Sequence, residues 1–168
     1  KGAIMTLIFG ISVIGWMHTI TGSIAIVLGL YILWQYKIIS SRLTSGKIYI
    51  ILTALSAATS LLIFNKGGFN LAHLLGIITI VALLVGYICE RKDFFGLSSY
   101  VQAASYSSTL LFSLIPGMSE IFTRLPAGNP LADSIFDPIL QKTFLFLTFL
   151  FFCLITYQSY WIRFKSKA

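Results

Sequence analysis

Residues 13–36, with the sequence VIGWMHTITGSIAIVLGLYILWQY, decide the class of this protein. The run contains no Asp, Glu, Lys or Arg, and a membrane-spanning helix needs about 20 predominantly apolar residues. The apolar stretch begins earlier, at Ile4, and as one straight helix it would reach about 45 Å against a hydrocarbon core of about 30 Å. We therefore expect the segment either to tilt and protrude or to lay the part before Gly15 along the membrane interface.

The composition of the whole chain points to the same class. Of its 168 residues, 57% are hydrophobic and 10% are charged, whereas about 25% of the residues in soluble domains are charged. A water-soluble fold of this size could not cover its surface with so few charges. The composition therefore excludes a soluble enzyme and a disordered tail, and it predicts a polytopic membrane protein.

Four further apolar segments follow the first, at residues 48–64, 69–89, 97–115 and 139–162. We predict an all-α, polytopic transmembrane helix bundle of five spans that forms a single domain over residues 1–168. Residues 117–138, between the fourth and fifth spans, are expected to form an external cap. Within it Glu120 and Arg124 are four residues apart, so a short helical turn would pair them.

The basic residues predict the orientation. Positively charged residues concentrate in the cytoplasmic loops of membrane proteins. Those in the first loop, the third loop and the tail outnumber those on the opposite side: they are Lys37, Arg42, Lys47, Arg91, Lys92, Arg163, Lys165 and Lys167. This places the N-terminus outside and the C-terminus in the cytoplasm, which requires an odd number of spans. The run from Ala3 to Trp16 has no small-residue cleavage site after it, so we expect it to be retained. There is no Arg-rich helix or stacking platform, and a nucleic-acid partner is not expected.

Two parts of the chain resemble each other. Both the first and the third segment open with His and then Gly, as His18 to Gly22 and His73 to Gly76, and both continue through aliphatic runs to a Gly and Tyr pair. The second and fourth segments each follow a basic loop and carry a run of small residues. This pattern predicts two helical hairpins in parallel orientation, followed by a fifth helix.

The two histidines are the candidate ligands. Ionisable groups within a membrane are functional candidates by default, and two histidines on facing helices can hold a haem iron from both sides. We therefore consider a b-type haem held by His18 and His73, with Gly22 and Gly76 leaving space for it beside the histidines. The same space could instead be filled by a tightly packed neighbouring helix. A transition metal is the other cofactor considered, held by the same histidines with Glu120 and Asp133. Alternatively, each neutral histidine bonds a backbone carbonyl or a serine and joins two helices. The sequence shows no catalytic constellation, so no catalytic residue is assigned and an enzyme is not favoured.

The fourth segment is the least lipid-like. A hydroxyl can bond back to its own helix at little cost, but an amide needs a partner. We expect this segment to be central, with Gln102, Ser105 and Ser108 in a polar interior that joins helices or, alternatively, lines a solvated pathway. The fifth segment is rich in Phe and is expected at the periphery. Besides the lipid bilayer, we expect a protein partner or a second copy to bind through the second and fifth segments.

Several short stretches resemble a family of small bacterial polytopic membrane proteins of unknown function. They are Met17–Gly29, Ser45–Tyr49 and Ala72–Gly76, with looser matches at Tyr100–Ser105 and Thr123–Pro130. The resemblance implies a multi-pass protein of the bacterial inner membrane and no particular activity. Ser45 stands where such proteins often carry a histidine. The architecture is also distantly similar to that of b-type membrane cytochromes.

Three functions follow from these observations. The first is a non-enzymatic accessory or scaffold subunit of a membrane complex. The second is a membrane electron carrier that binds haem or a metal through His18 and His73. The third is a channel that handles a small solute or a lipid through the fourth segment.

Overall fold

The protein is entirely α-helical over the residues that its computed structural model describes, 12–64 and 68–164. These residues form α1 (Val13–Tyr36), α2 (Thr44–Ser60), α3 (Leu71–Arg91), α4 (Ser98–Arg124) and α5 (Pro138–Phe164). Three of the helices, α1, α3 and α5, are long and apolar enough to cross a membrane. Helix α2 is shorter, at 17 residues, and α4 carries many hydroxyl side chains. The first expected interval, 13–36, matches α1, whereas residues 1–11 and their predicted interfacial position lie outside the described part.

The fourth helix is longer than predicted, and this corrects the cap. Helix α4 runs to Arg124 with Pro116 inside it, so the predicted external segment 117–138 is reduced to the connection 125–137. The prediction ended the span at Ile115 because Pro116 and Gly117 follow, whereas α4 continues through both residues. Glu120 and Arg124 form the expected ion pair at 2.5 Å. Helix α2 also differs, because it begins at the polar Thr44 and ends at Ser60.

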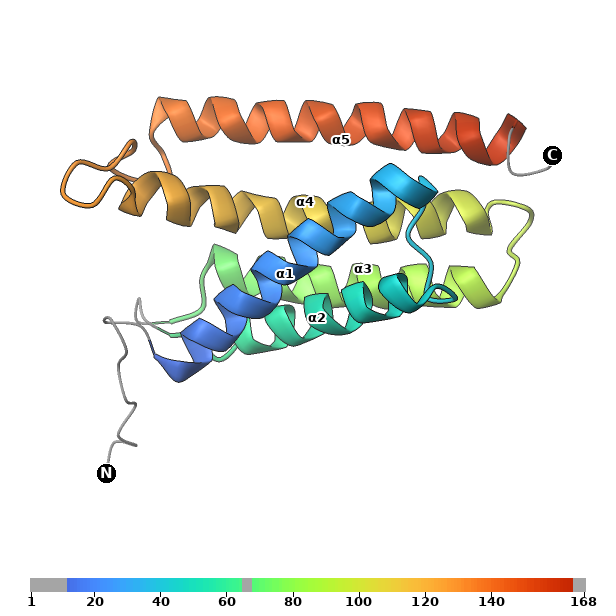
Figure 1. The fold of residues 1–168 in the computed structure, drawn as a ribbon, viewed down its shortest axis with the longest axis horizontal. Coiled ribbons are helices and arrows are strands. Elements are labelled where there is room, and N and C mark those ends of the chain that lie inside the picture. The colour runs from blue at the N-terminus through green and yellow to red at the C-terminus, as the bar shows by residue number, and fades with distance from the viewer. Residues whose placement is uncertain (1–11, 65–67, 165–168) are drawn as a thin grey trace.

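The helices run back and forth along the length of the molecule (Figure 1). The α1–α2 and α3–α4 connections lie at the end where α5 finishes, and the α4–α5 connection lies at the end where α1 begins. Helix α1 crosses the others obliquely and packs mainly on α2, while α3 packs mainly on α4. Helix α4 also contacts α1 and α5, so it is central as expected. Helix α5 packs on α4 and lies at the periphery.

The core is built from two tyrosines that pack on glycines. Tyr49 of α2 and Tyr106 of α4 are almost fully buried. A Cβ atom added at Gly29 of α1 would lie 2.7 Å from the Tyr49 ring, and one added at Gly86 of α3 would lie 2.7 Å from the Tyr106 ring. Glycine therefore allows each pair of helices to approach closely at these two points, as small residues do at helix interfaces in membranes.

Candidate functional site

His18 joins α1 to α2. Its Nδ1 donates to the backbone carbonyl of Ser56 at 2.9 Å, and the Ser56 hydroxyl donates to the His18 carbonyl at 3.2 Å. A Cβ atom at Gly22, one turn later, would lie 2.9 Å from the Ser56 Oγ. The space that Gly22 leaves beside His18 is therefore filled by a side chain of α2, which is the packed neighbour considered above as the alternative to a haem. The bonds also fix the tautomer in which Nδ1 carries the proton.

His73 is held in a different way. It is the third residue of α3, it is 2% exposed, and its ring lies 4.6 Å from that of Phe64 and 5.4 Å from that of Phe69. Its Nδ1 accepts from the Asn70 backbone N–H at 3.3 Å, as part of the cap of α3. A neutral imidazole that accepts at Nδ1 carries its proton at Nε2. In this arrangement Nε2 has no lone pair with which to bind a metal or a haem iron.

The predicted metal ligands do not form a site of three or more side chains among the described residues. No group of three or more His, Cys, Asp or Glu side chains in residues 12–64 and 68–164 is placed to hold a metal ion. Glu120 pairs with Arg124, and Asp133 lies in the α4–α5 connection, where its N–H donates to Asp137. Gly76 packs on α2, because a Cβ atom there would lie 2.6 Å from the Ser60 Oγ. The candidate ligands therefore form no three-residue site in the described part of the chain, and the buried Nε2 of His73 has no hydrogen-bond partner there.

The polar residues that were predicted in the interior of α4 bond to the α1–α2 connection and to α4 itself. Gln102 donates to the carbonyl of Ile39 at 3.1 Å, which is the partner that its amide was expected to need. The Ser108 hydroxyl donates to the carbonyl of Ser105 in its own helix at 2.8 Å. Both bonds are made within the protein: one holds the α1–α2 connection and the other stays inside α4.

A buried carboxylate that the sequence did not single out lies beside Gln102. Glu90, near the end of α3, is 8% exposed and accepts from the Ser40 hydroxyl at 2.5 Å, the Ser41 N–H at 3.0 Å and the Tyr106 hydroxyl at 3.1 Å. Arg42 donates to the Glu90 backbone carbonyl at 3.2 Å. A buried carboxylate is tolerated when donors surround it in this way.

Helix α5 is also hydrogen-bonded to the α1–α2 connection. Gln158, which is 1% exposed, donates to the carbonyl of Lys37 at 2.8 Å and accepts from the Ser107 hydroxyl at 3.1 Å. Glu90, Gln102 and Gln158, from α3, α4 and α5, therefore all bind the connection 37–43, and we call these three residues the loop clamp. Sequence reasoning missed Glu90 and Gln158 because their partners are backbone groups and hydroxyls from distant segments, which leave no pattern in the sequence. The available signal was a carboxylate directly after an apolar run and an amide within one.

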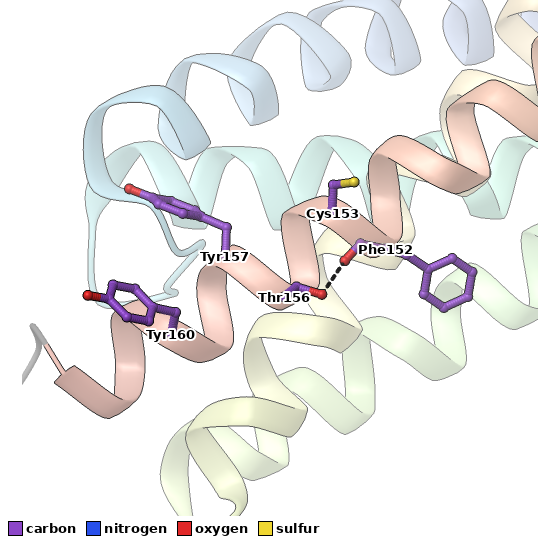
Figure 2. Close-up of a pocket in the computed structure, with 5 residues that line it drawn as sticks. All are labelled: Phe152, Cys153, Thr156, Tyr157 and Tyr160. Carbon is purple, nitrogen blue, oxygen red and sulfur yellow. Dashed lines mark hydrogen bonds between the residues drawn. The ribbon is translucent and has the colours of Figure 1, made fainter.

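The outer face of α5 carries a shallow hollow of about 570 Å³. Figure 2 shows that its side chains all rise from α5, with Cys153 and Thr156 between the rings of Phe152 and Tyr160. The Thr156 hydroxyl donates to the carbonyl of Phe152 at 2.9 Å. The middle of the hollow therefore holds small side chains, and its hydroxyl is already bonded within the helix. We call the set Phe152, Cys153, Thr156, Tyr157 and Tyr160 the α5 hollow.

The chain matches no known protein family, and no curated protein or solved structure shows significant similarity to it. The resemblance to a family of bacterial membrane proteins therefore stays a prediction.

Proposed function

We propose that this protein is a non-enzymatic accessory subunit of a membrane complex, which binds a transmembrane helix of its partner through the outer face of α5. The α5 hollow is the observation that carries this proposal. Small residues flanked by larger ones let helices approach closely in a membrane, where packing and not the hydrophobic effect drives helix association. A second copy of this chain and a different subunit are both partners that fit this description.

The way α5 is attached supports the proposal. Of the 27 residues in α5, those buried are Leu140, Gln158 and Ile162. The face away from α4 exposes large apolar side chains, namely Leu145, Phe146, Phe149, Phe152, Tyr157 and Tyr160. The loop clamp fixes α5 at one end by way of Gln158. Helix α5 therefore offers a fixed surface on which a partner helix can pack.

We place this subunit in a bacterial inner membrane with five spans, the N-terminus outside and the C-terminus in the cytoplasm. The arrangement of charges supports this orientation. Among the described residues, one end of the molecule carries Lys37, Arg42, Lys47, Arg91, Lys92 and Arg163. The opposite end carries Arg124 and Lys142. By the positive-inside rule the first end faces the cytoplasm.

The electron-carrier alternative has less support. His73 presents a protonated Nε2 as long as it caps α3, and Gly22 and Gly76 face side chains of α2 in place of an open space. A b-type haem would need the His73 tautomer to change and the cap to be given up. The lipid- or solute-handling alternative gains no support from Gln102 or Ser108, whose donors are used within the protein.

Photo-crosslinking from the α5 hollow tests the proposed function. A Cys89→Ala variant leaves Cys153 as the sole cysteine of the chain, and it is modified with a thiol-reactive benzophenone in native membranes. We expect a discrete protein adduct, whose mass tells a second copy from another subunit. The matched control moves the thiol to the exposed outer face of α3 through Leu84→Cys in a chain without the native cysteines. Lipid adducts alone at both positions would contradict the proposal.

A further inference from the structure

A second recess, on a different face of α5, is formed by three helices. It has a volume of about 520 Å³, within the range of about 300–1,000 Å³ that is usual for ligand sites. Its apolar lining comes from α1, α4 and α5, and consists of Leu30, Leu33, Leu110, Leu111, Leu114, Leu147, Leu150, Phe151 and Leu154. Its remaining lining residues are Trp34, Lys37, Ser107 and Tyr157. We call this recess the α1–α5 groove.

The groove is polar at one end and apolar along the rest. Lys37 and Tyr157 lie toward the end of the molecule that carries the α1–α2 connection, whereas Leu30, Leu114 and Leu147 lie farther toward the middle of their helices. On α5 the lining extends from Leu147 to Tyr157, ten residue steps or about 15 Å of helix. Trp and Tyr side chains mark the level of lipid headgroups in membrane proteins. Exposed Trp34 and Tyr157 therefore put the polar end of the groove at headgroup depth.

The charge at the polar end selects an anion. Lys37 follows α1 in the left-handed conformation, with φ 67°, and its ammonium donates to the carbonyl of Trp34. The ammonium lies 5.7 Å from the centre of the Trp34 ring. An ammonium has three N–H donors, so it can also bind a phosphate. The groove lining contains no carboxylate that would compete for it.

We infer that the α1–α5 groove binds an anionic phospholipid, with one acyl chain along the leucines and the phosphate at Lys37. The apolar groove alone would accept any acyl chain or a hydrophobic helix. The lysine at headgroup depth favours a lipid of net negative charge over a zwitterionic one, whose headgroup adds a positive charge beside its phosphate. It also disfavours an apolar helix, which brings no negative charge to this position. Ser107 lies at the same end but is bonded to Gln158, so the lysine provides the charge selectivity.

Native mass spectrometry of delipidated protein tests this inference. The protein is titrated with phosphatidylglycerol and with phosphatidylcholine of the same acyl chains. We expect phosphatidylglycerol to bind more tightly, and Lys37→Asn to weaken it about fivefold, the loss expected for one lysine at an anionic membrane surface. Asparagine is chosen because it tolerates the left-handed conformation. Lys47→Asn, at an exposed lysine of α2 outside the groove, should change neither affinity.

A second variant tests the apolar part of the groove. Leu114→Trp fills it and should weaken the binding of both lipids, whereas Leu84→Trp, on the exposed face of α3, should leave both unchanged. Equal binding of the two lipids to the native chain and to Lys37→Asn would overturn the inference. So would unaltered binding to Leu114→Trp. Photo-crosslinking from Leu30→Cys, made in a chain without the native cysteines, should give lipid adducts, and an adduct with a second copy or another protein would show that a helix occupies the groove.

Discussion

The hairpins α1–α2 and α3–α4 share one contact and differ in how their connections are held. Tyr49 follows Gly29 by 20 residues and Tyr106 follows Gly86 by 20, and in each hairpin the tyrosine ring packs on the glycine. Both hairpins run in the same direction along the molecule (Figure 1). The internal resemblance that the sequence indicated thus has a physical counterpart in two glycine–tyrosine contacts.

The connections are bound by different means. The loop clamp binds the connection 37–43 from α3, α4 and α5. The connection 92–97 is satisfied by its own neighbours, because the Ser98 hydroxyl accepts from the Phe94 N–H and the Asp93 carboxylate accepts from the Gly96 N–H. The second hairpin therefore anchors the connection of the first, whereas the bonds described for the connection 92–97 come from its own neighbours. The two hairpins therefore share the same glycine–tyrosine contact but differ in how far their connections depend on bonds from other helices.

The strongest test of this difference is Gly46→Ala in the first hairpin. A Cβ atom there would lie 1.9 Å from the carbonyl oxygen of Ser40, which is backbone held by the loop clamp. The matching position of the second hairpin is Ala103, which is buried and tolerates a Cβ. We expect a loss of about 4 kcal/mol in unfolding free energy, or no folded protein, in detergent unfolding titrations.

The control for Gly46→Ala is Gly68→Ala, where an added Cβ meets no atom within 4 Å. It should unfold like the native chain. If both variants have native stability, the connection 37–43 is not held as closely as described.

The next largest effect is expected at Glu90. Glu90→Ala leaves the Tyr106 hydroxyl, the Ser40 hydroxyl and the Ser41 N–H without their acceptor. Removing the acceptor of buried donors costs about 1–3 kcal/mol for each group that stays unpaired, and partial relaxation brings our expectation to about 3 kcal/mol. Glu90→Gln retains one acceptor oxygen and should lose about half as much. Amide hydrogen exchange should rise at the connection 37–43 and not at 92–97, and a rise at both would show that the anchor is not specific to the first hairpin.

Gly29→Ala and Gly86→Ala test the shared contact. Each adds a methyl group against a buried tyrosine ring, and overpacking of this kind costs about 1–3 kcal/mol. We expect about 2 kcal/mol from each in the same unfolding titration, because the distances to the two rings are equal. A clear loss in one variant and none in the other would mean that the two contacts are not equivalent.

The smallest effects concern the tyrosine hydroxyls. The Tyr49 hydroxyl pairs with the Thr109 hydroxyl at 2.7 Å, whereas that of Tyr106 pairs with a carboxylate. Hydrogen bonds between helices in membrane proteins are worth about 0.6 kcal/mol on average and up to about 1.7 kcal/mol, and those to charged groups are stronger. Tyr49→Phe should therefore cost about 0.6 kcal/mol and Tyr106→Phe about 1.5 kcal/mol. The reverse order would show that the carboxylate does not depend on Tyr106.

Much of the fold could be predicted from the sequence. The length of an apolar run is set by the thickness of the bilayer, and its period is set by the geometry of the α-helix. Helix α1 and the central position of α4 were expected, and so was the Glu120–Arg124 pair. The predicted ends of α2 and α4 were wrong. Helix α2 begins earlier, at the polar Thr44, and ends at Ser60 before the apolar residues 61–64, and α4 continues through Pro116 to Arg124. The hydrogen bonds that hold the connection 37–43 could not be predicted, since backbone carbonyls carry no signature in the sequence.

The attachment of α5 has a consequence for how the protein is made. Chains are synthesised from the N-terminus, and segments that emerge early can begin to fold before later ones. The contacts between the two hairpins involve α1 to α4 alone, so they can form while α5 is still in the ribosome. Gln158 then binds the carbonyl of Lys37, 121 residues earlier in the chain. This bond can form only when the first connection is already in place, so the order of synthesis matches the order in which these contacts can be made.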